Sequence, residues 1–188
     1  MTNTLLLSKP LTAHQCRNRV SEADFQRAMD FSEARASEYL TWRAMLYDYF
    51  GHLVEIAYNG AGAPEIVGSN LNIGVSHCVD CVAVVISEGG LCAVDVERKD
   101  RDVKRISQRF ITPQERELCS SEQELVALWC ARECYYKLRQ DRSLSMLTDI
   151  HVVALDMAAE VVTVEDNRTE RATFRIEQTA EHFIVYMV

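Results

Sequence analysis

The sequence predicts an α+β protein made of two halves of similar plan, each with helices packed on a small antiparallel sheet. Two observations predict this fold. Segments with helical periodicity are followed by β-branched runs, and the same order then repeats. No low-complexity linker divides the 188 residues, which suffice for two small halves that share a core. We expect halves over residues 1–90 and 91–188, with too little residue-level similarity to define a repeat.

The helices of the first half are predicted from their ends, and no element is predicted before them. Ser21, with an acid three positions later, predicts a helix start. A longer helix is predicted from Ser32 to Phe50, because apolar residues recur there at helical spacing. Gly51 follows at a position where helices commonly end.

Short β-branched runs follow this helix, and glycine-containing turns separate them. The turns are Asn59-Gly60 and Gly89-Gly90. We therefore expect one antiparallel sheet in this region. Its predicted strands are residues 54–58, 71–76, 82–86 and 91–97.

Helices return after residue 97. Thr112-Pro-Gln-Glu115 combines a capping threonine, proline at the first helical position and glutamate at the third. Ser121-Glu-Gln-Glu124 repeats the capping-box pattern before a helix that we expect to reach about Leu138. Strands resume at His151 and continue to Val188.

Composition and charge exclude several classes of protein. No apolar run is long enough to span a membrane, and the first residues lack the features of a signal peptide, so we expect a cytoplasmic protein. The net charge of −8 argues against a general nucleic-acid binder. Basic residues nevertheless cluster between Arg98 and Arg109, either as a solvated helix face or as a docking site for an acidic partner.

Seven cysteines lie mostly inside apolar segments, which favours buried, reduced thiols. Two pairs are closely spaced. The alternative to buried thiols is a zinc site or a redox pair, formed by Cys78 with Cys81 and Cys130 with Cys134.

Three patterns can carry chemistry. Asp95 and Glu97 project from the same face of a predicted strand, either as magnesium ligands or as two hydrated acids at a fraying strand end. Glu133 and Lys137 share one face of a largely apolar helix, either as a surface ion pair or facing a polar cleft. Ser76-His77 lacks the glycine pattern that surrounds the nucleophile of a serine hydrolase. The two residues either bind a phosphate group, or His77 has only a structural role.

Four motifs occur in a characteristic order over about residues 70 to 140, and together they resemble the signature of the 4′-phosphopantetheinyl transferase superfamily. They are Gly74-Val-Ser-His77, Ala93-Val-Asp-Val-Glu97, Arg109-Phe110 with Thr112-Pro-Gln-Glu115, and Leu128-Trp-x-x-Arg-Glu-x-x-x-Lys137. The length and the arginine-rich helix from Arg35 to Arg43 are similar to the monomeric, two-halved class of this superfamily.

The resemblance implies a monomer that transfers the 4′-phosphopantetheine arm of coenzyme A to a serine of an apo acyl or peptidyl carrier protein. The first half would lie on the coenzyme A phosphate side, and no nucleic acid or membrane would take part. In this family pattern Mg²⁺ is held by Asp95, Glu97 and Glu133. The resemblance implies that the catalytic residues would be Glu133, as the base for the serine proton, and Lys137, and that coenzyme A would contact Ser76, His77, Lys137 and Arg43.

The sequence departs from the family pattern at three places. Gly62-Ala63-Pro64 stands where Gly-Lys-Pro is usual, so one phosphate-binding cation is missing. Arg132 replaces a lysine, and no glycine-rich turn follows Lys137. Because of these departures, the alternative is that the protein is a non-catalytic relative that binds a carrier protein or coenzyme A.

Overall fold

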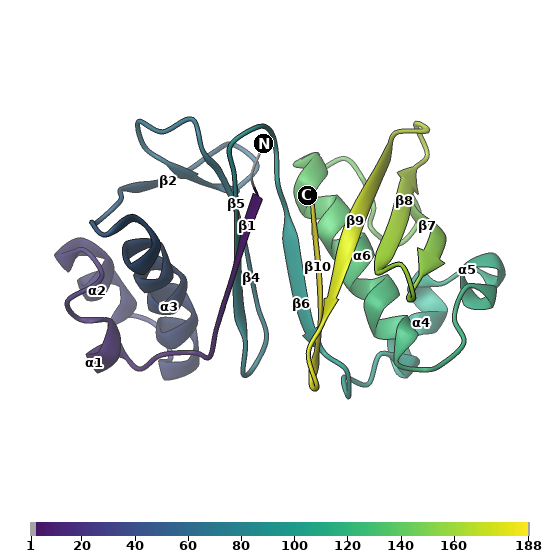
Figure 1. Cartoon of the computed structure of the whole chain (residues 1–188), viewed down its shortest axis with the longest axis horizontal. Helices are drawn as coiled ribbons and strands as arrows, with labels where there is room; N and C mark the ends of the chain where they lie inside the picture. The colour runs from purple at the N-terminus through teal and green to yellow at the C-terminus, as the bar shows by residue number, and fades with distance from the viewer. Residues whose placement is uncertain (1–2, 188) are drawn as a thin grey trace.

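The computed structural model describes residues 3–187 and has two five-stranded antiparallel sheets that face each other. Figure 1 shows helices α1 to α3 outside the first sheet and α4 to α6 beside the second, with the two sheets in the middle. The predicted α+β class is confirmed. None of the helices in the described part of the chain is long and apolar enough to cross a membrane.

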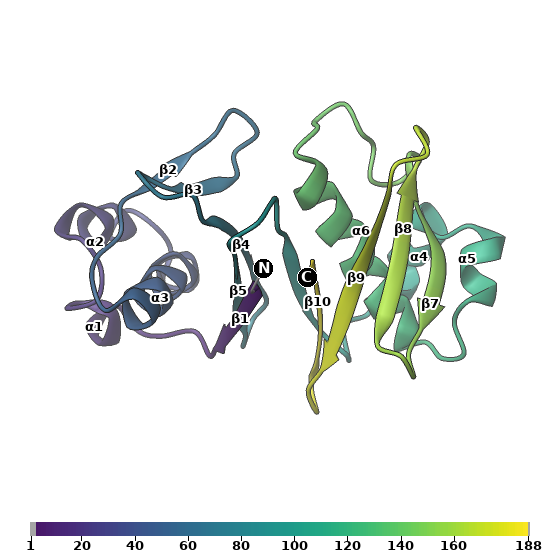
Figure 2. The same cartoon turned by 45° about the horizontal axis from the view of Figure 1, so that its top comes forward.

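The first sheet has the strand order β1-β5-β4-β3-β2, and α3 packs on its outer face. Figure 2 shows the β2–β3 hairpin projecting from the upper end of this sheet. The strands are β1 (Asn3–Ser8), β2 (Ile56–Tyr58), β3 (Pro64–Ile66), β4 (Asn72–His77) and β5 (Val82–Ser87). The helices are α1 (Ala13–Cys16), α2 (Glu22–Ala28) and α3 (Glu33–Phe50).

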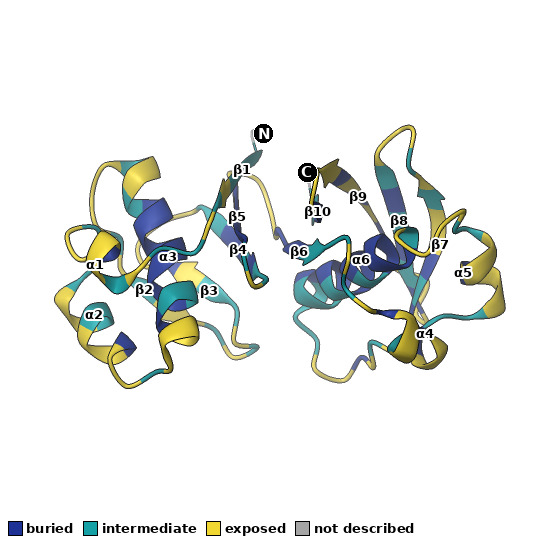
Figure 3. Cartoon of the chain, turned by 90° about the horizontal axis from the view of Figure 1, so that it is seen from below, coloured by how far each residue is buried: buried dark blue, intermediate teal, exposed yellow. Residues whose placement is uncertain are grey.

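The second sheet has the strand order β6-β10-β9-β8-β7. Its strands are β6 (Val94–Arg98), β7 (Ile150–Asp156), β8 (Val161–Asp166), β9 (Arg171–Gln178) and β10 (His182–Met187). The helices are α4 (Lys104–Phe110), α5 (Pro113–Glu117) and α6 (Glu124–Arg139). Helix α6 contacts all five strands, and Figure 3 shows that it is mostly buried while α1, α2 and α5 are largely exposed.

The predicted helix ends are mostly confirmed. Ser21, Ser32 and Thr112 accept hydrogen bonds as N-caps, and Gly51 ends α3 in the left-handed region at φ 74°. The capping box at Ser121 is misplaced. The helix begins at Glu124 with Gln123 as its N-cap, although the Ser121 hydroxyl accepts a bond from the Glu124 amide at 3.3 Å.

Three strand predictions need correction. The run 91–97 is not a strand of the first sheet, because β6 pairs with β10 and enters the second. Strands β1 and β3 were not predicted from the sequence. β1 is an edge strand held by its pairing with β5, and β3 is only three residues long, so neither has a strong local signal.

The two sheets pack through a shared apolar layer. Val94, Val96 and Ile184 of the second sheet meet Ala83 and Val85 of the first. Since side chains alternate along a strand, Asp95 points away from this layer and toward α6, as the sequence predicted from the alternation of Val94 and Val96.

Candidate functional site

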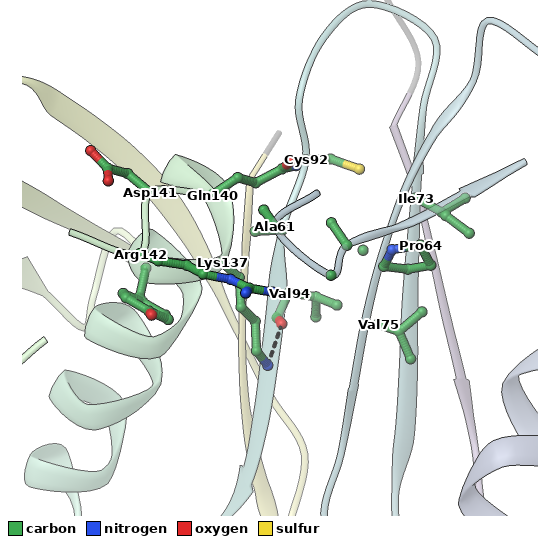
Figure 4. Close-up of a pocket in the computed structure, with 15 residues that line it drawn as sticks. Ala61, Pro64, Ile73, Val75, Cys92, Val94, Lys137, Gln140, Asp141 and Arg142 are labelled. Atoms are coloured by element: carbon green, nitrogen blue, oxygen red, sulfur yellow. Dashed lines mark hydrogen bonds between the residues drawn. The ribbon is translucent and has the colours of Figure 1, made fainter. Parts of the chain in front are cut away.

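A groove of about 260 Å³ lies where the two sheets and the end of α6 meet (Figure 4). One wall comes from the β2–β3 hairpin and β4, and the other from the start of β6 and the end of α6. The residues that line the groove include Ala63, Gly74, Val94, Lys137, Gln140 and Arg142.

Lys137, Asp95 and Ser76 form a closed hydrogen-bonded network beside this groove. The ammonium group of Lys137 donates to Asp95 Oδ1 at 2.7 Å, to Ser76 Oγ at 3.0 Å and to the Val94 carbonyl at 3.2 Å. Ser76 Oγ in turn donates to Asp95 Oδ1 at 2.9 Å. Burial is the largest single effect and lowers the pKa of Lys137, but the charge of Asp95, its hydrogen bond and the other nearby acidic groups together outweigh it, so the pKa is raised and the side chain stays cationic.

The second carboxylate oxygen of Asp95 is buried and has no hydrogen-bond partner among the described residues. An ionised oxygen in this position is costly unless a cation or a donor reaches it. Oxygen ligands of this kind suit Mg²⁺, so the chemistry of Asp95 fits such an ion.

Glu97 on β6 and Glu133 on α6 are the other two carboxylates predicted to bind Mg²⁺. Glu97 is paired with Arg101. Burial first, and then the negative charge of Asp95, raise the pKa of Glu133. Among the described residues these three carboxylates do not form a group whose ligand atoms lie within 4.8 Å of one another. Their joint role as metal ligands stays a prediction.

His77 and Ser76 point to opposite faces of β4, as adjacent strand residues do, and His77 lines a second hollow beside α3. Its Nδ1 lies 3.3 Å from Glu38 and its Nε2 lies 3.2 Å from Arg35, both on α3. Burial lowers the pKa of His77, and Glu38 opposes the shift. The structure therefore brings Ser76, and not His77, to Lys137.

Arg43 is almost fully buried beneath the first sheet. Its guanidinium nitrogens donate to Asp24 at 2.9 Å, to the Tyr39 carbonyl at 3.1 Å and to the Tyr58 hydroxyl at 3.1 Å. The group also stacks on the rings of Tyr39 and Trp42. Each nitrogen thus has a partner within the protein, and contact with coenzyme A stays a prediction.

Arg132 does not face the groove either. It is fully buried and pairs with Glu115 at 2.5 Å, while it donates to the Met146 carbonyl at 2.8 Å. Glu115 also accepts the Val152 amide at 2.8 Å, so this ion pair joins α5, α6 and β7. The arginine that precedes Glu133 is therefore part of the core.

Arg142 is a groove residue that sequence reasoning did not single out. Its guanidinium extends across the groove, and a Cβ built on Gly62 would lie 3.4 Å from its Nη2 (Figure 4). The Arg142 side chain forms no hydrogen bond or ion pair with any of the described residues. The one available signal was a basic residue soon after Lys137, close to the missing glycine-rich turn.

The cysteines are free thiols, and most are buried, as the sequence predicted. The proposed grouping of Cys78, Cys81, Cys130 and Cys134 is not found among the described residues. Cys130 and Cys134 lie inside α6, where burial, followed by the charge of Asp95, raises their pKa.

A lysine and a serine hydroxyl beside a groove between two α+β halves can bind an anionic substrate, because both can donate hydrogen bonds to it. The sequence model described as the 4′-phosphopantetheinyl transferase superfamily matches residues 92–186, just over half of the chain. The chain belongs to this superfamily of transferases. No curated protein matches it. The matched range contains Asp95, Glu97, Glu133 and Lys137, whereas Arg43, Ser76 and His77 lie outside it.

Proposed function

We propose that this protein transfers the 4′-phosphopantetheine arm of coenzyme A to a serine of an apo acyl or peptidyl carrier protein. The observation that carries the proposal is the Lys137–Asp95–Ser76 network with its unpaired Asp95 oxygen, in a chain of this superfamily.

Asp95, Glu97 and Glu133 would hold Mg²⁺, which neutralises charge on the pyrophosphate of coenzyme A. Asp95 supports this role because one of its oxygens is buried without a partner. Lys137, held in place by Asp95 and Ser76, would stabilise the negative charge that develops on the leaving phosphate. The partners of His77 on α3 would have to move aside if His77 contacts coenzyme A.

Glu133 would act as the base. The carrier serine oxygen attacks the phosphorus that bears the pantetheine arm, and the bond to the other phosphate breaks. Adenosine 3′,5′-bisphosphate leaves with the bonding electron pair, and the serine proton passes to Glu133. A carboxylate whose pKa is raised by burial is a stronger base than an exposed one.

The two halves supply both walls of the groove within one chain, which supports a monomer as the active unit. Coenzyme A and a carrier protein would be its only partners, in the cytoplasm. The exposed cations of α4 would receive the acidic carrier protein.

The experiment that tests this function is incubation of the purified protein with coenzyme A, Mg²⁺ and apo carrier proteins of the host, followed by intact mass measurement. The proposal requires that at least one carrier gains the phosphopantetheine arm. If no carrier gains it while coenzyme A or a carrier still binds, the protein is a non-catalytic binding relative.

Replacement of Glu133 by Gln tests the base. The variant keeps the size of the side chain but cannot accept the serine proton, so we expect transfer to be nearly abolished. Glu117→Gln, which changes an exposed glutamate of α5, serves as the matched control and should transfer at the wild-type rate. An unchanged rate in Glu133→Gln would show that another group is the base.

A further inference from the structure

The structure brings together three side chains of metal-binding type at a second place, where the β4–β5 turn meets β10. Cys78, Asp80 and His182 each present one ligand atom, and these atoms lie within 4.8 Å of one another. They are the only such group of three among the described residues. We propose that they form a binding site for one divalent cation of the zinc class.

The spacing of the three atoms fits such an ion. Asp80 Oδ1 lies 2.8 Å from His182 Nε2 and 3.5 Å from Cys78 Sγ. In a tetrahedral zinc site, bonds of about 2.0–2.3 Å place neighbouring ligand atoms about 3.3–3.8 Å apart. The distance from the sulfur to Asp80 Oδ1 is within this range, the distance from the imidazole nitrogen to Asp80 Oδ1 is about 0.5 Å shorter, and the sulfur and the nitrogen lie within 4.8 Å of each other. Water would complete the coordination.

The groups around the three ligands favour this role. His182 Nδ1 lies 3.2 Å from the hydroxyl of Thr179, which orients the ring so that Nε2 faces Asp80. Arg98 pairs with Oδ2 of Asp80, so Oδ1 of Asp80 remains directed toward Cys78 and His182. Both contacts have the form of the supporting hydrogen bonds that orient metal ligands in proteins.

The charges of the site also fit. Arg98 is balanced by Asp100, whose oxygens lie 2.8 Å from its Nε and Nη2. A thiolate at Cys78 and the carboxylate of Asp80 together neutralise a divalent ion. On binding, the Cys78 thiol releases its proton to solvent, and the imidazole keeps one proton, on Nδ1, beside the Thr179 hydroxyl.

The site would join the two sheets, because Cys78 and Asp80 follow β4 and His182 begins β10. It contains none of the carboxylates proposed to hold Mg²⁺, so it does not depend on the transferase function. The mixture of sulfur, nitrogen and oxygen ligands favours Zn²⁺ over Mg²⁺.

Titration of the chelator-treated, full-length protein with Co²⁺, a spectroscopic substitute for Zn²⁺, tests the proposal. We expect one equivalent to bind and to produce a thiolate-to-cobalt charge-transfer band, which Zn²⁺ then removes by displacement. The carboxylates near Lys137 offer no sulfur among their proposed ligands and would give no such band. Absence of a thiolate band in the wild-type protein would overturn the proposal.

Matched variants identify the ligands. Cys78→Ser should lose the band, and His182→Gln should weaken Co²⁺ binding by about tenfold or more. Cys119→Ser changes a half-buried cysteine outside the group and should keep the wild-type band. Circular dichroism checks that each variant is folded, and if Cys78→Ser is not, His182→Gln and Asp80→Asn decide the outcome. A band that persists in Cys78→Ser, or unchanged affinity in both of the other variants, would contradict the site.

Discussion

Asp95 shows how the position of one side chain determines what it can bind. It is 5% exposed, and one of its oxygens receives both Lys137 and Ser76. The other oxygen receives no donor. An exposed aspartate would satisfy both oxygens with water, whereas burial leaves the second oxygen of Asp95 without a partner among the described residues.

Arg142 is the residue for which we predict a role in coenzyme A affinity. It reaches into the groove beside Ala63, where the family pattern has a lysine, and it has no ion-pair partner among the described residues. A hydrogen bond to a charged phosphate contributes about 1.5–3 kcal/mol. Arg142→Gln should therefore raise the KM for coenzyme A by about tenfold or more, measured by initial rates of carrier modification.

Arg175→Gln is the control for loss of one exposed arginine, because Arg175 lies on β9 and does not line the groove. It should leave the KM for coenzyme A unchanged. Equal KM values in the two variants would exclude a phosphate contact by Arg142.

At the scale of elements, the close packing of β4 against β6 depends on Gly74. A Cβ at this position would lie 2.9 Å from Val85 Cγ1 and 3.0 Å from the Cα of Ala93. The second contact is with backbone, which cannot rotate away. The glycine of the Gly-Val-Ser-His motif thus allows the two sheets to approach each other beside Ser76.

Gly74→Ala is expected to destabilise the protein by about 1–3 kcal/mol, because the added methyl group overpacks the junction. Urea unfolding measures the change in the free energy of unfolding. Gly60→Ala, whose added Cβ would meet no atom within 4 Å, should change it far less. A Gly74→Ala protein as stable as the Gly60→Ala protein would show that the sheets can separate at little cost.

Asp24 links α2 to α3 and gives the stability of this pair a pH dependence. It accepts from the Tyr39 hydroxyl at 2.6 Å and from Arg43 Nε at 2.9 Å. Burial raises the pKa of Asp24, but its hydrogen bonds with Tyr39 and Ser21 and the charge of Arg43 outweigh this, so the pKa is lowered. Its contribution to stability is complete above the pKa of the unfolded chain and is lost as pH falls through the lower folded value.

Asp24→Asn should remove this part of the acid dependence, so that the free energy of unfolding falls less steeply below about pH 4 than in the wild-type protein. Urea unfolding at a series of pH values measures the slope. Asp30→Asn, just beyond α2, is the control for loss of one acid. An unchanged slope in Asp24→Asn would mean that Asp24 has the same pKa in the folded and unfolded states.

For the whole molecule, the distribution of charge matters more than its sum. The net charge is −8, yet α4 exposes Lys104, Arg105 and Arg109 to solvent. Arg98 and Arg101 belong to the same basic run but are paired with Asp80, Asp100 and Glu97. Lys104 lies 4.0 Å from Glu122, so the cations of this run without an ion pair among the described residues are Arg105 and Arg109 of α4 and the partly exposed Lys99.

If the carrier protein docks on α4, its KM should rise with ionic strength, because salt screens attraction between exposed charges. Arg105→Gln should also raise this KM and weaken its dependence on salt, while the KM for coenzyme A stays constant. Rates measured at several salt concentrations test both points. A carrier KM that is independent of salt would place the docking surface elsewhere.

Local features of the sequence predicted much of this protein. The caps at Ser21, Ser32 and Thr112 could be predicted because a cap bonds to backbone within its own turn. The alternation around Asp95 could be predicted because the strand period fixes which side chains share a face.

Only the tertiary structure decided the rest. The sequence could not pair β6 with β10 or turn Arg132 toward Glu115. Lys137 meets Ser76 across 61 positions of the chain, and Asp80 meets His182 across 102. Contacts of this kind depend on how the two sheets pack, and no local pattern encodes that packing.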